Sequence, residues 1–154
     1  AAEAMDVALA ASWNGRDSGL PMKTPDELLT LASIVEKETG KAEERPRISG
    51  VFVRRLQKGM RLETDPTVIY GIGEGYDGNI RKKDLQTVTP YNTYRMHGLP
   101  PTPIAMPGRA ALEAAAHPAP GESLFFVATG DGGHVFSATY EQHRKAVKTY
   151  QLKP

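Results

Sequence analysis

The clearest hydrophobic pattern in this 154-residue sequence lies between Thr24 and Gly40. Apolar side chains recur there at the i, i+3, i+4, i+7 spacing of one helix face, at Leu28, Leu31, Ala32 and Val35. Thr24 and Pro25 supply an N-cap and a proline suited to the first helical position, and Gly40 suits the position after the C-cap. The pattern predicts a helix from Pro25 to about Thr39.

The last turn of this predicted helix carries two carboxylates, Glu36 and Glu38, which flank opposite borders of the apolar stripe. The spacing leans slightly towards Glu38 as the one aimed into a cleft. The negative end of the helix dipole disfavours an ionised carboxylate, and apolar surroundings would raise its pKa further. A raised pKa suits a general acid near neutral pH. By itself the pattern favours two solvated surface charges, because charged residues are mostly exposed.

The rest of the pattern predicts further helices and one hairpin. Helical spacing and stop residues predict helices over 3–14, 45–58, 107–117 and 139–150, with shorter ones near 65–70 and 84–85. Thr64 is placed to cap the helix near 65–70, and Thr139 with Gln142 forms a capping box. Apolar runs on both sides of residues 130–133 predict a β-hairpin. We therefore expect an α+β fold, a mostly helical single domain with a small antiparallel sheet.

The stretch from 97 to 108 is too rich in proline for a regular element. Long ordered loops of this kind are often functional. The segment just before it, Tyr91 to Tyr94, adds aromatic faces and the amide of Asn92, which are groups that a sugar site uses. A sugar site and a rigid loop that covers the core fit this pattern equally well.

Composition narrows the function classes. The absence of cysteine excludes disulfides and thiolate metal sites. A net charge of +1 gives no argument for a nucleic-acid partner, and the arginines at 47, 54 and 55 fit a solvated helix face. No apolar run approaches the roughly 18 residues of a membrane span. The sequence begins without an initiator methionine, which suggests a piece of a longer protein.

Several kinds of catalytic site lack their residues here. The histidines at 97, 117, 134 and 143 do not have metal-binding spacing, and none is adjacent in sequence to a carboxylate cluster. No serine lies in a nucleophile elbow, and the glycines from 71 to 75 lack the lysine and the strand of a phosphate loop. We therefore expect no metal or other cofactor. A carboxyl acid near polar and aromatic loops remains, which favours glycosidic-bond chemistry.

Long motifs occur in a fixed order along the chain: Ala32 to Thr39, Gly59 to Gly71, Tyr91 to Tyr94, Gly98 to Pro101, Ile104-Ala105, Pro107-Gly108, 114–118, 126–128 and 132–136. Together they resemble the bacterial endolytic murein transglycosylases, the MltG/YceG-like family. The resemblance covers about residues 5 to 150. It implies that residues 1–154 form the catalytic domain of such an enzyme, without the membrane anchor and the LysM-like region that family members carry.

The resemblance implies a lytic transglycosylase, a lyase that cuts nascent peptidoglycan endolytically between N-acetylmuramic acid and N-acetylglucosamine. Such cuts leave 1,6-anhydro ends and terminate strand elongation. The catalytic acid maps to Glu38, on a helix like the one that carries the acid in lysozyme. The residues implied to bind the strand are Thr39, Glu63, Thr64, Asp65, Tyr91, Asn92, Thr93 and Tyr94.

The same resemblance implies the setting of the enzyme. Its partners are expected to be peptidoglycan glycan strands and cell-wall synthesis enzymes. Its location is expected to be periplasmic, as part of a single-pass inner-membrane protein. Two other functions stay open: a muramidase-type hydrolase that uses Asp65 as second carboxylate, and a non-catalytic glycan-binding module that uses the proline-rich loop. A third, nucleic-acid binding, is weak because few aromatics accompany the arginines.

Overall fold

The computed structural model of the chain describes residues 2–151. Its helices and strands are α1 (Ala2–Asn14), α2 (Pro25–Glu38), η1 (Ala42–Glu44), α3 (Arg45–Lys58), α4 (Asp65–Ile72), η2 (Gly73–Gly75), α5 (Lys82–Gln86), α6 (Arg109–Ala116), β1 (Phe125–Ala128), β2 (His134–Ser137) and α7 (Tyr140–Tyr150). The predicted α+β fold, mostly helical with one small antiparallel sheet, is confirmed.

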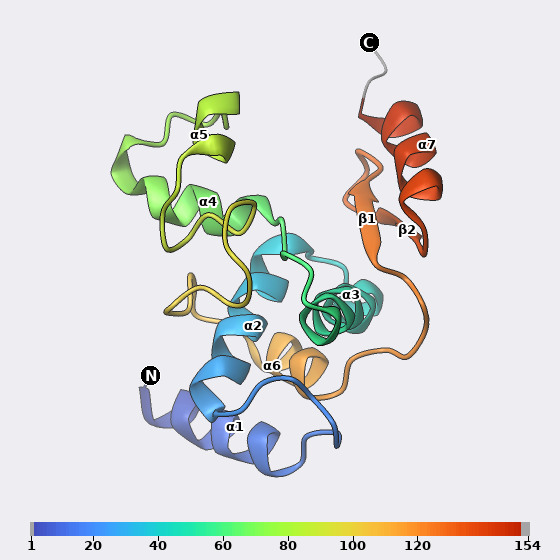
Figure 1. Cartoon of the computed structure of the whole chain (residues 1–154). Helices are drawn as coiled ribbons and strands as arrows, with labels where there is room; N and C mark the ends of the chain where they lie inside the picture. The colour runs from blue at the N-terminus through green and yellow to red at the C-terminus, as the bar shows by residue number, and fades with distance from the viewer. Residues whose placement is uncertain (1, 152–154) are drawn as a thin grey trace.

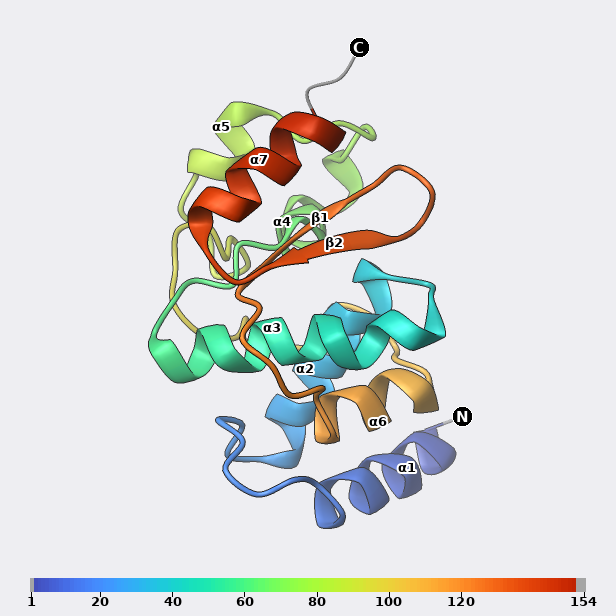
Figure 2. The same cartoon turned by 90° about the vertical axis from the view of Figure 1, so that its right-hand side faces the viewer.

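Helix α2 is the centre of the helical part of the molecule, where it packs against α1, α3, α4 and α6 (Figures 1 and 2). Its predicted apolar stripe is fully buried. The Thr24 hydroxyl accepts a hydrogen bond from the Glu27 N–H, as the capping pattern predicted. The helix ends at Glu38, with Thr39 as its C-cap residue, so Glu38 is the last helical residue.

The hairpin and α7 form a separate layer above α3 (Figure 2). Strands β1 and β2 pair antiparallel, with Phe125 opposite Ser137 and Ala128 opposite His134. The capping box of Thr139 and Gln142 is present at the start of α7, as predicted. In Figure 1 this layer lies on one side of the end of α2, while α4 and α5 lie on the other.

Arg54 and Arg55 do not lie on the solvated face of α3 that the sequence predicted, whereas Arg47 is exposed, as predicted. Arg55 is only 7% exposed, and it donates hydrogen bonds to the carbonyls of Leu124 and Arg61. Arg54 donates to two further carbonyls, and Arg47 lies over the Phe136 ring. Arg54 and Arg55 bind the segment that leads to the hairpin, because a guanidinium can satisfy several backbone acceptors at once.

The proline-rich loop covers part of the core. Ile104 is buried, and its N–H donates to the Ser33 hydroxyl of α2 at 3.0 Å. Helix α6 follows at Arg109 rather than at Pro107, because Gly108 is its N-cap residue.

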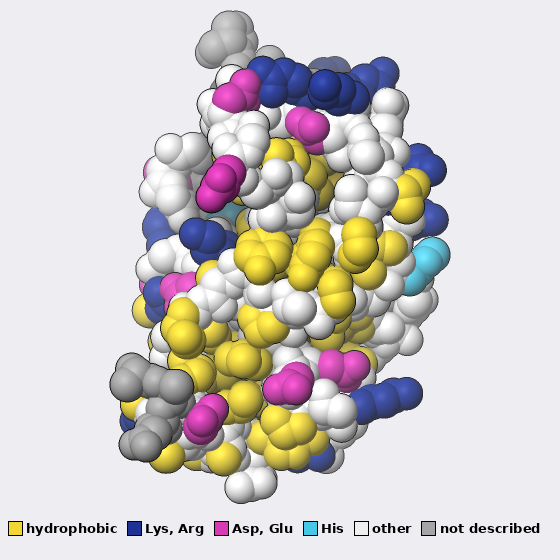
Figure 3. Space-filling view, turned by 90° about the vertical axis from the view of Figure 1, so that its left-hand side faces the viewer, with side chains coloured by type: hydrophobic (Ala, Val, Ile, Leu, Met, Phe, Trp, Pro, Cys, Tyr) yellow, Lys and Arg dark blue, Asp and Glu magenta, His cyan; other side chains and the backbone are white. Residues whose placement is uncertain are grey.

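Figure 3 shows the face of the molecule that lies on the left in Figure 1. Hydrophobic side chains extend across the middle of this face, and Lys and Arg side chains lie along its upper edge. Within residues 2–151 no helix is long and apolar enough to cross a bilayer.

Candidate active site

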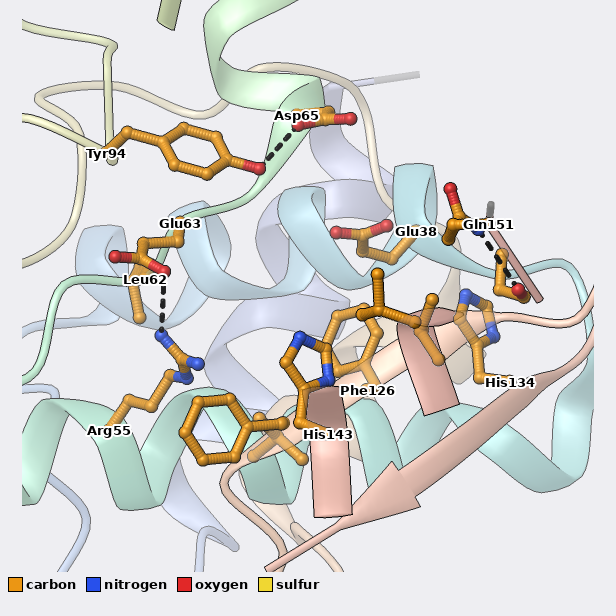
Figure 4. A pocket seen from close by; sticks show the side chains of 15 residues that line it. Glu38, Arg55, Leu62, Glu63, Asp65, Tyr94, Phe126, His134, His143 and Gln151 are labelled. Atoms are coloured by element: carbon orange, nitrogen blue, oxygen red, sulfur yellow. Dashed lines mark hydrogen bonds and ion pairs between the residues drawn. The ribbon is translucent and has the colours of Figure 1, made fainter. Parts of the chain in front are cut away.

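A cavity of about 420 Å³ opens beside the end of α2 (Figure 4). Its walls come from α2, α3, the segment before α4, both strands and α7. The polar side chains that line it are Glu38, Arg55, Glu63, Asp65, Tyr94, His134, His143 and Gln151, and the apolar ones include Leu62, Phe125 and Phe126. A concave site with aromatic walls and several convergent polar groups is typical of a ligand pocket.

Glu38 is the carboxyl group of this cavity whose pKa is raised. Burial is the largest cause that raises its pKa, from the usual 4.5 to about 6, and the nearby charge of Asp65 raises it further. A hydrogen bond from Thr64 and the charge of His134 act in the opposite direction. A carboxyl group with a pKa of about 6 is partly protonated near neutral pH, so it can donate a proton and later accept one.

Thr64 holds the Glu38 carboxyl group in place. Its hydroxyl donates to Glu38 Oε2 at 2.5 Å. The Thr64 N–H donates to the Thr93 hydroxyl at 3.0 Å, and the Thr64 carbonyl accepts from the Thr67 hydroxyl at 3.0 Å. Thr64 is the N-cap residue of α4, as predicted, but its side chain makes no cap hydrogen bond, because the hydroxyl is used by Glu38. The three buried threonines therefore form a rigid support under the acid.

Asp65 and Tyr94 lie on the α4 side of the cavity and contact one another (Figure 4). The Tyr94 hydroxyl donates to Asp65 Oδ1 at 2.6 Å. Burial, together with that hydrogen bond and the negative charges around it, raises the pKa of Tyr94 well above its usual range. Tyr94 is therefore a neutral hydroxyl at all ordinary pH values, and Asp65 is an exposed carboxylate at the mouth of the site.

Glu63 occupies a strained position in the same cavity. It is the one described non-glycine residue with positive φ, at 52°. Its carboxylate lies 3.8 Å from Arg55 Nη1, on a side chain that is 47% exposed. Backbone strain of this kind clusters at functional sites, where the surrounding structure over-determines it. Arg55 fixes one face of Glu63, and the Glu63 N–H donates to the Thr93 carbonyl.

The comparisons with known proteins agree on one family. The YceG-like family is matched over residues 1–149. The chain belongs to the YceG-like family. A relative from Bacillus subtilis (strain 168), named endolytic murein transglycosylase, is 44% identical over 124 residues, which cover 80% of this chain and 34% of that protein.

Two further similarities support the family. A protein of the same name from Streptococcus pneumoniae serotype 2 (strain D39 / NCTC 7466) is 36% identical over 123 residues, which cover 77% of this chain and 22% of that protein. The crystal structure of a YceG-like protein from Listeria monocytogenes superimposes with a TM-score of 0.75 at 45% identity, covering 79% of this chain and 40% of the other. The YceG-like chain thus spans about a third or less of the curated relatives it matches.

The structure separates the residues that the sequence named for the site into two groups. Glu38, Glu63, Asp65 and Tyr94 line the cavity. The others lie behind it or away from it: Thr39, Thr64, Tyr91, Asn92 and Thr93 are not among the lining residues.

Members of the second group make hydrogen bonds within the protein. The Asn92 amide donates to three carbonyls at the end of α5, and its oxygen accepts from the Tyr94 N–H. The Thr39 hydroxyl donates to Glu44, and the Tyr91 hydroxyl lies 2.7 Å from that of Thr102. In the YceG-like chain, Asn92 therefore positions Tyr94.

Four polar lining residues, Arg55, His134, His143 and Gln151, were not named by reasoning from the sequence. Arg55 was placed on a solvated face, and His134 and His143 were set aside because they lack metal-binding spacing and are not adjacent to a carboxylate cluster. In the structure His134 Nδ1 lies 2.8 Å from Glu44 Oε1, although 90 residues separate them. His143 stacks on Phe125, with ring centroids 4.9 Å apart. The sequence signals for His134 were its place at the end of the hairpin turn and its position in the 132–136 motif of the family resemblance.

Metal chemistry has no obvious site here. Among the described residues, no group of three or more histidine, aspartate or glutamate side chains is arranged to hold a metal ion. The acids of the cavity are instead bound to threonine and tyrosine hydroxyls and to Arg55.

Proposed function

We propose that this YceG-like chain is the catalytic domain of an endolytic murein transglycosylase, with Glu38 as its general acid. One observation carries the proposal: Glu38 lines a cavity of about 420 Å³ with a pKa raised to about 6 and a hydroxyl donor fixed on its carboxyl group. The names of the relatives from Bacillus subtilis and Streptococcus pneumoniae supply the polymer, which is murein.

The proposed reaction cuts the β-1,4 bond between N-acetylmuramic acid and N-acetylglucosamine. Protonated Glu38 donates to the bridging oxygen, and the bond from C1 to that oxygen breaks. The substrate's own N-acetyl oxygen stabilises the charge that develops at C1, so no second enzyme carboxylate is required. Ionised Glu38 then takes the proton of the muramic C6 hydroxyl, and O6 closes on C1. The product ends in a 1,6-anhydro sugar, and no water is consumed.

The cavity supports specific roles for three predicted binding residues. Asp65 and Glu63 offer acceptors for sugar hydroxyl groups, and the neutral Tyr94 hydroxyl is oriented by Asp65. Phe125 and Phe126 offer apolar faces for sugar rings. Thr64 acts through Glu38, because its hydroxyl is engaged there.

We further propose the cellular setting that the family resemblance implied. The domain acts on nascent glycan strands on the extracytoplasmic side of the inner membrane, as part of a single-pass protein, and its cuts terminate strand elongation. Cell-wall synthesis enzymes are the expected partners, because they supply the nascent strands.

A hydrolase is the second candidate, because Asp65 lines the same cavity as Glu38 and could serve as the second carboxylate. Mass spectrometry of the fragments released from polymeric murein separates the two reactions. A transglycosylase releases ends that are lighter than reducing ends by one water, whereas a hydrolase releases reducing ends alone. Glu38→Gln serves as the inactive control. Reducing-end muramic acid as the sole product would refute the transglycosylase.

A non-catalytic glycan-binding module would use the proline-rich loop. A second cavity of about 650 Å³ does lie between this loop and α2, but its walls are mostly proline and leucine. No aromatic ring lines it, so it lacks the flat surface on which sugars usually stack. The mass-spectrometric experiment also tests this alternative, since a binding module releases no fragments.

A further inference from the structure

A second buried carboxylate lies next to the cavity, outside the site that the sequence named. Glu44 is the last residue of η1, and only 11% of its side chain is exposed. Its Oε2 accepts from the His134 N–H at 2.9 Å, and its Oε1 lies 2.8 Å from His134 Nδ1. The Thr39 hydroxyl donates to the same Oε1 at 3.3 Å. One carboxylate thus joins β2 to the residue that follows Glu38.

These contacts keep Glu44 ionised. Burial alone would raise its pKa, but the hydrogen bonds and charge of His134, with the Thr39 hydroxyl, outweigh burial and hold the pKa of Glu44 below its usual range. An ionised carboxylate fixes an imidazole with Nδ1–H towards it, as carboxylates do for metal-bound histidines. Nε2 makes no hydrogen bond within residues 2–151, and the ring itself lines the cavity that holds Glu38.

We propose that the Glu44–His134 pair is the electrostatic partner of Glu38. When Glu38 donates its proton, a negative charge appears in a cavity that already contains Asp65 and Glu63. The charge of His134, which lowers the pKa of Glu38, offsets that new charge, and Glu44, which does not line the cavity, holds the ring where it does so. His134 is therefore a positioning residue that acts through Glu38. The inference rests on the proposed role of Glu38 as acid.

The other charged groups around Glu38 do not supply this partner. Arg55 on α3 is bound to two backbone carbonyls and to Glu63. His143 on α7 has a lowered pKa, because of burial and the charge of Arg55, and it is neutral near pH 7. On the α4 side, Asp65 and the Tyr94 hydroxyl that donates to it add no positive charge.

The hairpin turn carries two more charges next to His134. Lys41 and Asp131 lie on either side of Gly133, and the charge of Lys41 helps to hold the pKa of Asp131 below its usual range. Neither side chain lines the cavity that holds Glu38, whereas His134 does.

A direct titration of Glu38 tests the pairing without any need for turnover. Carbon-13 NMR of the protein with labelled glutamate gives the pH at the midpoint of the Glu38 carboxyl titration. The signal of Glu38 is identified because it is absent from the spectrum of Glu38→Gln. We expect a midpoint of about 6 in the unmodified protein. His134→Gln should move it to higher pH, because the attraction that favours ionised Glu38 is lost. Glu44→Gln keeps one of the two acceptors for the hairpin and, because it holds the His134 ring less firmly, should shift the midpoint in the same direction by less.

His117→Gln is the matched control. His117 is also paired with a carboxylate, 2.7 Å from Asp17 Oδ1, but on the surface and away from the cavity. In His117→Gln, the titration midpoint of Glu38 should equal that of the unmodified protein. An unchanged or lower midpoint in both His134→Gln and Glu44→Gln would overturn the pairing, with circular dichroism verifying that each variant is folded.

Kinetics on polymeric murein then separate this inference from the proposed function. His134→Gln should lower kcat by about three- to tenfold, with little change in KM, and shift the pH profile upwards together with the NMR midpoint. If the unmodified protein releases anhydro products but the Glu38 midpoint is unchanged in His134→Gln and Glu44→Gln, the proposed pairing is wrong and the proposed function stands. A moved midpoint without anhydro products from any variant would instead remove the proposed function.

Discussion

The last turn of α2 presents two carboxylates to two very different regions. Glu38 faces the cavity, where burial raises its pKa to about 6 and the Thr64 hydroxyl binds it. Glu36 faces α6, where its Oε1 accepts the Gly108 N–H at 2.6 Å. That N–H belongs to the N-cap residue of α6, so Glu36 helps to fix the start of the helix. Two identical side chains, two residues apart, are thus placed by their neighbours in a cavity and at the start of another helix.

The sharpest way to break this comparison is to neutralise each glutamate in turn. Glu38→Gln should lower turnover of polymeric murein by at least about 10²–10⁴-fold, because the proton donor is removed. Glu36→Gln keeps an acceptor for Gly108 and should leave turnover within about twofold of the unmodified protein. Release of anhydro fragments, followed by chromatography, measures both. A large loss of turnover in Glu36→Gln with full activity in Glu38→Gln would show that the acid is Glu36 and not Glu38.

The second prediction concerns the hydroxyl that distinguishes the two surroundings. Thr64→Val removes the donor to Glu38 Oε2, and we expect turnover to fall by about tenfold, the size of a lost hydrogen bond to a charged group. The pKa of Glu38 should rise, since this hydrogen bond lowers it, and the pH profile should shift upwards. Thr64→Ser restores a hydroxyl and should recover most of the activity. Equal loss in both variants would indicate a packing effect instead.

The third prediction is that Glu38 lowers the stability of the fold. Its pKa is raised from 4.5 in the unfolded chain to about 6 in the folded one, so between these values the folded state binds more protons. Stability from this group is therefore present below about pH 4.5 and is lost as the pH rises to about 6. The loss is on the order of 2 kcal/mol.

Urea unfolding of Glu38→Gln and the unmodified protein measures this difference. At pH 7.5 the variant should be the more stable of the two, and near pH 4 the two free energies of unfolding should converge. Equal stability at both pH values would contradict a buried, destabilised acid.

The smallest expected effect belongs to the other glutamate. Glu36→Ala removes the acceptor of the Gly108 N–H and should lower the free energy of unfolding by about 0.5–1.5 kcal/mol. Glu36→Gln, which keeps a carbonyl acceptor, should lose less. Thermal or urea unfolding provides the measurement. No loss of stability in Glu36→Ala would mean that water replaces the carboxylate without cost.

Much of the fold was readable from local signals. Thr24-Pro25 began α2, Gly59 followed α3 in a left-handed conformation, and Thr139 with Gln142 capped α7. Caps and helical spacing act within a few residues, so they are visible in the sequence. The site was less readable. The contacts of Thr64 with Glu38 and with Thr93 span 26 and 29 positions, and the Glu44–His134 contact spans 90.

By itself the sequence determined the helices, the hairpin, the absence of disulfides and the position of two glutamates at the end of one helix. Its motifs also identified the YceG-like family, which the comparisons confirmed. Only the tertiary structure decided which glutamate lines a cavity and which one binds the N-cap residue of a neighbouring helix. The physical reason is that desolvation depends on what packs around a carboxylate, and those neighbours come from distant parts of the chain.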